Sequence, residues 1–234
     1  MSVDKKLFFL HIPKTAGTSL RKLIKKEYPG KACLYLYYPA PFQPAVIKEI
    51  HANLPAAKVL YGHFSFGIHQ LLGIQGHYVA FLRNPIERVI SFYNHNARQS
   101  DTPYYAAIQE GLSLLDMLQS ERIPETNNHV TRIIACCGLP GMLDDTRVLE
   151  QALDNIEKHF CFVGLVERFA ESVNLLGKKL GWKSSHTIPY LNVDTTKPLH
   201  QIDAQTQAAL EKYNRLDMLL YEHVNQRYIM KYSL

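Results

Sequence analysis

Short continuous apolar runs alternate along this chain with longer segments in which apolar residues recur at helical spacing. Continuous apolar runs are typical of strands buried in a parallel sheet, because helices then cover both faces of that sheet. We expect such strands at Lys6–Leu10, Leu34–Tyr38, Lys58–Tyr61, Tyr78–Leu82 and Cys161–Leu165. We expect helices at Arg147–Lys158, at Ala170–Leu180 and, as one long final helix, from about Ala204 to Met230.

This alternation predicts an α/β protein with a central, mainly parallel sheet flanked by helices. The proline-containing segments 39–44 and 138–141 are short enough to be loops rather than linkers. With 234 residues and 47% hydrophobic residues, the chain can bury a large core without metal or disulfides. We therefore expect one domain over residues 1–234.

The first apolar run leads into a tight polar loop, His11-Ile12-Pro13-Lys14-Thr15-Ala16-Gly17-Thr18-Ser19, which opens a helix. Backbone N–H groups, a helix N-terminus and the Lys14 ammonium would meet there, and together they favour a phosphate or sulfate group. The loop is not a Walker A motif, because Lys14 precedes Gly17 by three residues instead of following it. A simpler alternative is that Gly17 and Ser19 only cap the helix.

A second anion-binding pattern follows the apolar run at 78–82, where the sequence reads Arg83-Asn84-Pro85-Ile86-Glu87-Arg88-Val89-Ile90-Ser91-Phe92-Tyr93. Asn84 suits the cap of a helix and Pro85 its first position. Arg83 would then lie at the carboxyl end of a strand, with Ser91 two turns into the helix. A guanidinium can hold a phosphate through two hydrogen bonds and a hydroxyl can add a third. Open α/β sheets bind their ligands at this edge.

Composition and short motifs give no support for a metal site or for a serine hydrolase. The four cysteines show no C-x-x-C spacing and no H-E-x-x-H segment occurs, so we expect no metal site. No G-x-S-x-G segment supports a serine hydrolase. The net charge is a modest +5, and Arg21, Lys22, Lys25 and Lys26 are explained best as the solvated face of the helix after the loop. Without a run of 18 apolar residues, a signal-peptide pattern or a glycosylation sequon, we expect a cytoplasmic, bacterial protein with no membrane span and no nucleic-acid partner.

The two anion motifs resemble those of sulfotransferases that use 3′-phosphoadenosine 5′-phosphosulfate (PAPS). Residues 11–19 resemble the 5′-phosphosulfate loop, and residues 83–93 resemble the 3′-phosphate motif. The nearest resemblance is to the family that includes heparan sulfate 2-O- and 6-O-sulfotransferases and bacterial relatives, and it continues through segments 126–132, 162–169, 192–197 and 216–221. It implies a P-loop-like sulfotransferase domain over nearly the whole chain.

The resemblance also implies roles for individual residues. Lys14 would contact the bridging oxygen of the phosphosulfate, and Thr15, Ala16, Gly17, Thr18 and Ser19 would hold the 5′-phosphate. Arg83 and Ser91 would hold the 3′-phosphate that distinguishes PAPS from ATP, and Lys197 would close over the nucleotide. Arg88 is left with two alternatives, a ligand contact or a salt bridge with a neighbouring carboxylate.

Transfer of a sulfuryl group to an alcohol needs a base, and the candidate is His63 in Val59-Leu60-Tyr61-Gly62-His63. The ordinary pKa of histidine, about 6.5, suits this work, and in related glycan sulfotransferases a histidine after the corresponding strand takes the proton. A histidine bonded to a loop carbonyl is the alternative. His11 would orient the phosphate loop rather than react.

These residues together predict a PAPS-dependent O-sulfotransferase that acts on a hydroxyl of an acceptor, such as a saccharide, by in-line displacement. A Mg²⁺-dependent phosphotransferase and a non-catalytic PAPS- or glycan-binding module are the alternatives. The segment 96–128, with Tyr104 and Tyr105, offers aromatic rings that could stack on a sugar, and Asn127, Asn128 and Arg132 are further candidate contacts. Ordinary packing explains all of them equally well.

Overall fold

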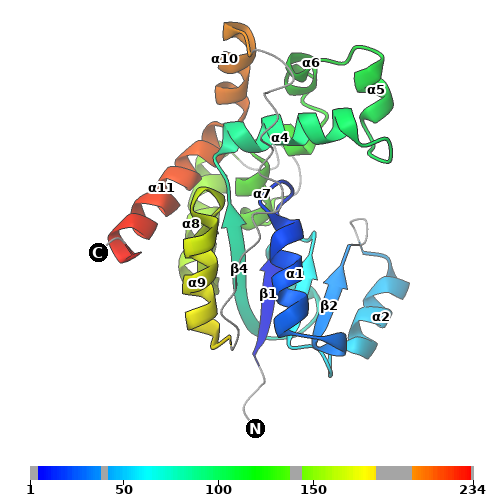
Figure 1. The fold of residues 1–234 in the computed structure, drawn as a ribbon, viewed down its shortest axis with the longest axis vertical. Coiled ribbons are helices and arrows are strands. Elements are labelled where there is room, and N and C mark those ends of the chain that lie inside the picture. Colours follow the sequence, from blue (N-terminus) through cyan, green and yellow to red (C-terminus); the bar gives the residue numbers. More distant parts are fainter. Residues whose placement is uncertain (1–4, 38–41, 138–143, 183–201, 233–234) are drawn as a thin grey trace.

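A computed structural model describes residues 5–37, 42–137, 144–182 and 202–232. Its centre is a sheet of five parallel strands in the order β2-β3-β1-β4-β5 (Figure 1). The strands are β1 (Lys6–Leu10), β2 (Cys33–Leu36), β3 (Val59–Gly62), β4 (Gly76–Leu82) and β5 (Phe160–Leu165). The α/β prediction is therefore confirmed, and each of the five expected strands exists to within a few residues.

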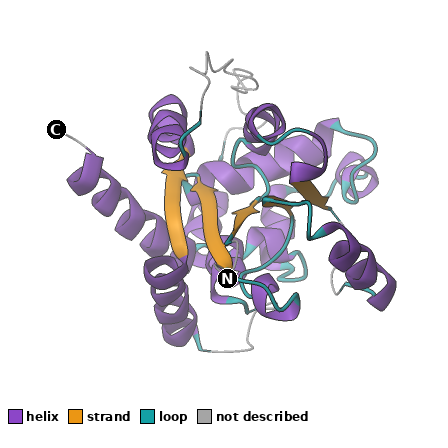
Figure 2. Cartoon of the chain, turned by 90° about the horizontal axis from the view of Figure 1, so that it is seen from below, coloured by secondary structure: helices purple, strands orange, loops and turns teal. Residues whose placement is uncertain are grey.

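Helices cover both faces of the sheet (Figure 2). One face packs on α1 (Gly17–Glu27) and α9 (Phe169–Leu180), with Phe9, Val79 and Phe81 of the strands at its centre. The other face packs on α2 (Pro44–Asn53), α7 (His129–Ala135), α8 (Asp145–His159) and α11 (Arg215–Tyr232). Complete burial of a side chain such as Phe8 or Leu60 contributes about 1.5–3 kcal/mol, so this double-sided core supplies much of the stability.

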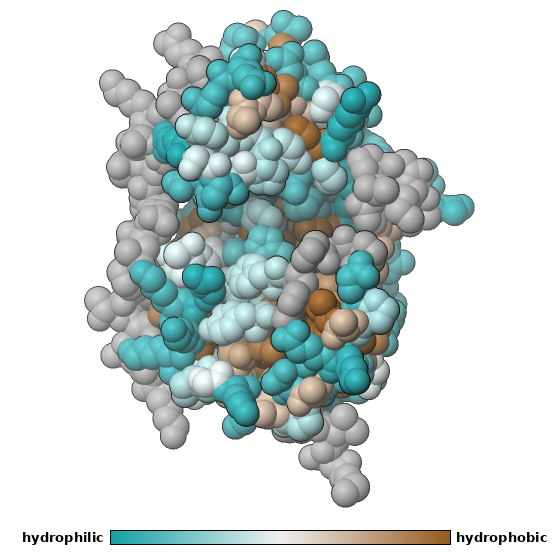
Figure 3. Space-filling model, turned by 90° about the vertical axis from the view of Figure 1, so that its right-hand side faces the viewer, coloured by the Kyte–Doolittle hydropathy of each residue, from teal (hydrophilic) through white to brown (hydrophobic). Residues whose placement is uncertain are grey.

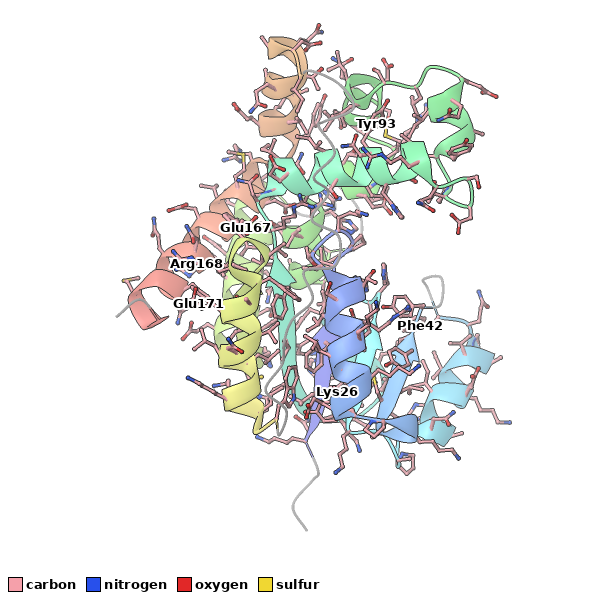
Figure 4. The ribbon with its side chains drawn as sticks, viewed as in Figure 1. Lys26, Phe42, Tyr93, Glu167, Arg168 and Glu171 are labelled. Carbon is pink, nitrogen blue, oxygen red and sulfur yellow. The ribbon has the colours of Figure 1, made fainter. Side chains whose placement is uncertain are left out.

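A smaller helical layer lies over the carboxyl ends of the strands, at the top of Figure 1. It consists of α4 (Pro85–Arg98), α5 (Tyr105–Gln109), α6 (Leu114–Gln119) and α10 (Ala204–Tyr213), and we call it the helical cap. Val89, Leu118 and Leu210 form its apolar centre, and the Tyr93 hydroxyl donates a hydrogen bond to the Leu112 carbonyl 3.1 Å away (Figure 4). The remaining elements are α3 (Ile68–Leu71) and the 3₁₀ turns η1 (Gly30–Ala32), η2 (Pro124–Thr126) and η3 (Val166–Arg168).

The expectation of one long final helix is wrong. The helix is interrupted at Asn214, whose backbone has φ −119° and ψ 23°, so α10 belongs to the helical cap and α11 to the face of the sheet. The Asn214 side chain is fully buried and donates to the carbonyls of Thr126 and Leu210, each at 3.0 Å. Asparagine competes with the helix for backbone groups in this way, which explains the break. Leu216, Leu220 and Val224 of α11 do form one buried face.

Candidate active site

The loop between β1 and α1 is held in an unusual backbone conformation. Lys14 and Ala16 have φ values of +70° and +61°, in the left-handed region that costs residues other than glycine free energy. The Thr15 hydroxyl, buried beneath the loop, donates to the Ile12 carbonyl 2.8 Å away and closes the turn. Such strain is common where the backbone must present its N–H groups to a ligand.

The N-terminus of α1 is open for an anion. Its cap residue, Ala16, has no side chain that can accept from the first N–H groups, and the first turn contains no acidic residue. Ala16 therefore offers no side-chain acceptor to the first amides of the helix, and the helix dipole favours negative charge beside them. Gly17 is required there because a Cβ would lie 1.6 Å from Nε2 of His11.

The second predicted anion position lies at the start of α4. Arg83 follows β4, and its guanidinium is 3.6 Å from the Glu87 carboxylate. The Asn84 side chain accepts from the N–H groups of Ile86 and Glu87 at 3.1 and 3.2 Å, so the predicted cap of α4 is confirmed. Arg83 is thus fixed at the carboxyl edge of the sheet, where open α/β sheets bind their ligands.

Glu167 supports this turn from η3, directly after β5. One carboxylate oxygen accepts from the Asn84 N–H at 2.7 Å, and the other accepts from the Tyr221 hydroxyl at 2.9 Å (Figure 4). Glu167 therefore ties the turn that carries Arg83 to α11. The sequence offered no signal for this role, since the contact joins residues that lie 83 positions apart.

A cleft of about 460 Å³ separates the helical cap from the carboxyl edge of the sheet, and Figure 3 shows the face of the molecule on which it opens. It brings together most of the predicted site residues, namely Lys14, Ala16, Gly17, Thr18, Ser19, His63, Arg83 and Ser91. Thr15 does not line the cleft, since its hydroxyl is turned into the loop. Lys197 lies outside the described residues.

His63 lies on the wall of this cleft, immediately after β3. Its backbone N–H donates to the Leu36 carbonyl at 2.9 Å. Its imidazole ring lies against the rings of His11 and Tyr37, at centroid distances of 4.6 and 4.9 Å. The side chain is exposed to the cleft, yet partial burial against the surrounding protein lowers its pKa below the ordinary 6.5. His63 is therefore held as the neutral form, which is the form that can accept a proton.

His11 is packed beneath the same loop. Its Nδ1 lies 2.9 Å from the Tyr37 hydroxyl, and its ring stacks on Tyr61 at 5.3 Å. Burial, together with smaller electrostatic contributions from His63, Arg21 and Lys14, lowers the pKa of His11 to about 3. A neutral, packed ring of this kind supports the loop, in agreement with the orienting role expected for it.

Of the two alternatives for Arg88, a ligand contact or a salt bridge with a carboxylate, the structure shows the salt bridge. The side chain is fully buried, donates to the Glu125 carbonyl at 2.7 Å and forms an ion pair with Asp217 at 4.0 Å. Asp217 also accepts from the N–H groups of Val130 and Thr131 at 3.1 and 2.8 Å. Arg88 therefore joins the start of α4 to α7 and α11 and does not line the cleft.

Packing also explains the candidate contacts at 127–132. Asn128 accepts from the N–H groups of Leu216 and Asp217 at 2.8 and 3.3 Å, at the start of α11. Arg132 donates to Asn127 and to the Pro124 carbonyl at 3.2 and 2.8 Å. None of these three side chains lines the cleft.

Some residues of the cleft were not foreseen as site residues. Phe92, His95 and Asn96 of α4 line it, as does Glu125 of η2. His95 stands one helical turn after Ser91, so helical spacing could have placed it on the same wall. Glu125 carried no comparable signal, because the connection between α6 and α7 that brings it to the cleft has no periodicity.

Within the described ranges, no three histidine, cysteine or acidic side chains converge as ligands for a metal ion. Among the helices that the structure describes, none is both long and apolar enough to span a membrane. The exposed side chains of Arg21, Lys22, Lys25 and Lys26 form the solvated face of α1 that the sequence predicted.

Comparisons with known proteins agree with the fold and with the expected family. The profile of the Sulfotransferase family matches residues 1–224, so the chain belongs to this family. Human galactose-3-O-sulfotransferase 2 is 20% identical over 241 residues, which cover 94% of this chain and 59% of that protein. Human heparan-sulfate 6-O-sulfotransferase 2 is 24% identical over 286 residues, which cover 98% of this chain and 46% of that protein.

The chain thus spans about half the length of the curated relatives that it matches, from 45% to 59%. The crystal structure of a sulfotransferase from Alicyclobacillus acidocaldarius aligns with a TM-score of 0.52 at 13% identity, covering 93% of this chain and 96% of that one. At this identity the likeness shows the fold. The expected resemblance to sulfotransferases is confirmed.

Proposed function

We propose that this protein is a PAPS-dependent O-sulfotransferase in which Lys14 and His63 act on the transferred group. The observation that carries the proposal is the arrangement around one cleft, in which an uncapped helix N-terminus with Lys14, a second cationic position at Arg83 and a neutral histidine all meet. A nucleotide with a 5′-phosphosulfate and a 3′-phosphate needs two separated anion positions, and the cleft offers both.

The residues present fit that donor. The amides of Gly17, Thr18 and Ser19 would hold the 5′-phosphate, and the absence of a Cβ at position 17 leaves His11 room to pack beneath the loop. Arg83 and the Ser91 hydroxyl would hold the 3′-phosphate. PAPS supplies an activated sulfuryl group, and Lys197 remains a proposed contact from the sequence.

The reaction would be a direct in-line displacement. His63 would take the proton of the acceptor hydroxyl while the acceptor oxygen forms its bond to sulfur and the bond from sulfur to the bridging oxygen breaks. Lys14 and the loop amides would stabilise the charge that develops on the departing 3′-phosphoadenosine 5′-phosphate (PAP). Positioning and charge stabilisation supply most of the acceleration in the related phosphoryl transfers, and we expect the same here.

The acceptor would be a carbohydrate hydroxyl. The names of the relatives support this class, since the curated matches are a galactose 3-O-sulfotransferase and heparan-sulfate 6-O-sulfotransferases. The aromatic pair Phe92 and Tyr104 at the cleft also suits a sugar ring.

Calorimetric binding of PAP tests the donor, with Mg-ATP and 5′-AMP as comparison ligands. We expect PAP to bind without metal and the Arg83→Ala variant to bind it about 10- to 150-fold more weakly, because a charged hydrogen bond contributes about 1.5–3 kcal/mol. Arg122→Ala is the matched control, since this arginine is exposed and does not line the cleft. Equal or tighter binding of Mg-ATP would overturn the proposal in favour of a phosphotransferase, and PAP binding without turnover of PAPS would favour a binding module.

A further inference from the structure

Tyr61 lies near the end of β3, and its hydroxyl reaches the first turn of α1. It donates a hydrogen bond of 2.7 Å to the carbonyl of Gly17. The side chain is fully buried, and its ring stacks on His11 at a centroid distance of 5.3 Å and meets Phe9 at 6.3 Å. Tyr61 does not line the cleft, so its hydroxyl meets α1 from within the core rather than from the ligand side.

The sheet fixes the position of this hydroxyl. Tyr61 pairs with Phe9 of β1 in parallel register, and the N–H of His11 donates to the Gly62 carbonyl at 2.9 Å. Burial raises the pKa of Tyr61 well above the ordinary value for tyrosine, so the hydroxyl stays protonated and remains a donor. The Gly17 carbonyl therefore meets a donor that is in place whether or not a ligand is bound.

The Gly17 carbonyl and the Thr18 N–H belong to the same peptide unit. Such a unit is planar and trans, so its C=O and N–H point in opposite directions and cannot turn independently. Thr18 is exposed and lines the cleft, and its N–H precedes that of Leu20, which bonds to the Ala16 carbonyl at 3.1 Å. A hydrogen bond that holds the Gly17 carbonyl from the core side thus also fixes the direction of an N–H at the open end of the helix.

This bond supports the loop in two ways. The loop contains the left-handed residues Lys14 and Ala16, and a strained backbone of this kind persists only where surrounding contacts hold it. Hydrogen bonds in a chain also polarise one another, so a donor on the Gly17 carbonyl makes the Thr18 N–H a stronger donor to an anion. Both effects favour an oxyanion beside Thr18.

From this geometry we infer that Tyr61 is a positioning residue for the 5′-phosphate of the donor, because its hydroxyl holds the Gly17 peptide unit so that the Thr18 N–H donates to that phosphate. The inference rests on the proposed sulfotransferase function and adds a residue to its donor site. Tyr61 itself touches neither donor nor acceptor, and its effect passes through the peptide unit between Gly17 and Thr18.

The Tyr61→Phe variant removes the hydroxyl and keeps the ring. We expect it to bind PAP about 3- to 10-fold more weakly in calorimetry, as for the loss of one hydrogen bond. Tyr78→Phe is the matched control, since Tyr78 of β4 is also fully buried, its hydroxyl lies 2.8 Å from Nδ1 of His69 in the core on the other face of the sheet, and it does not line the cleft. Both variants lose one buried hydrogen bond, so their urea midpoints should fall similarly, whereas Tyr78→Phe should leave the affinity for PAP unchanged.

Ligands with a single phosphate separate positioning from general loosening of the protein. 5′-AMP keeps the phosphate that the Thr18 N–H would bind, whereas 3′-AMP lacks it, and the affinity of each is measured by displacement of PAP. In Tyr61→Phe, 5′-AMP should lose affinity by the same factor as PAP, and 3′-AMP should keep its affinity. With PAP bound, the amide proton of Thr18 should also resonate upfield of its wild-type position, because its hydrogen bond is weaker.

The outcomes separate the two proposals. If the wild type does not bind PAP, the sulfotransferase proposal is overturned, and this inference with it. If the wild type binds PAP and Tyr61→Phe binds it equally well, the inference alone is overturned. The inference is also overturned if Tyr61→Phe weakens PAP, 5′-AMP and 3′-AMP alike, or if Tyr78→Phe weakens PAP as much, because loss of stability then explains the effect.

Discussion

Replacement of Gly17 by alanine is the most direct test of how the phosphate loop is supported. A Cβ at this position would lie 1.6 Å from Nε2 of His11 and 2.2 Å from its Cδ2. The ring has to move from 1.6 Å to an ordinary contact of 3.4 Å, a displacement of about 1.8 Å. It cannot swing away freely, because Nδ1 is bonded to Tyr37 and the ring stacks on Tyr61.

The magnitude follows from two contributions. Overpacking of a filled site costs about 1–3 kcal/mol, and loss of the bond between His11 and Tyr37 costs about 0.5–1.5 kcal/mol. We therefore expect Gly17→Ala to lower the free energy of unfolding by about 1.5–4.5 kcal/mol, read from the midpoint of urea denaturation. Turnover should fall at least about 100-fold, since a misplacement of about 1 Å in an active site has this effect.

A double-mutant cycle isolates the cause. In a His11→Ala background the space is open, so adding Gly17→Ala should cost about 1–3 kcal/mol less than it does in the wild type. Gly177→Ala is the control, because a Cβ there lies 3.3 Å from Trp182 and needs only a small adjustment. Strict additivity of the two substitutions at positions 11 and 17 would refute the explanation by steric contact.

Three further predictions concern the site and its supports. His63→Ala should lower kcat about 10²–10⁴-fold with PAP binding intact. In the wild type, the decline of kcat/KM on the acid side should have its midpoint below pH 6.5, because burial lowers the pKa of His63 and keeps the base neutral into mildly acidic solution. A midpoint at or above pH 6.5 would contradict this reasoning. Glu167→Gln should raise the Kd for PAP about 3- to 10-fold in calorimetry by loosening the turn at Asn84, whereas Glu150→Gln, at an exposed carboxylate on α8, should leave it unchanged. Asp217→Asn should lower the free energy of unfolding by about 3–5 kcal/mol because it removes the carboxylate that pairs with the buried Arg88, and combining it with Arg88→Met should recover part of this loss in urea denaturation.

Local patterns were enough to predict the elements that carry the proposed anion sites. The strand at Lys6–Leu10 is found with the predicted bounds, and the cap of α4 at Asn84 uses only neighbouring residues. Both are governed by short-range rules, namely buried apolar runs and side chains that accept from amides two or three residues away.

Contacts between distant segments could not be predicted in the same way. The break at Asn214 depends on the carbonyl of Thr126, 88 residues earlier, and the partner of Arg88 is Asp217 on another helix. Glu125 reaches the cleft only because Arg88 and Arg132 bind the carbonyls of the turn that carries it. In each instance a side chain satisfies a group that folding brings close, which no periodicity in the sequence records.

Because the start of α1 has no capping side chain, an anion bound there would take the place of the helix cap. An anion at this position supplies the hydrogen-bond acceptor that Ala16 lacks, so binding and folding are thermodynamically linked. Occupancy at 100 times the Kd adds about 2.7 kcal/mol to the stability of the folded state. We expect inorganic sulfate and phosphate to compete for the same amides, so that melting temperatures and nucleotide affinities of this protein would depend on the buffer anion. Variants are therefore compared best in chloride solutions without either oxyanion, and under the proposed function PAP would itself stabilise the folded protein.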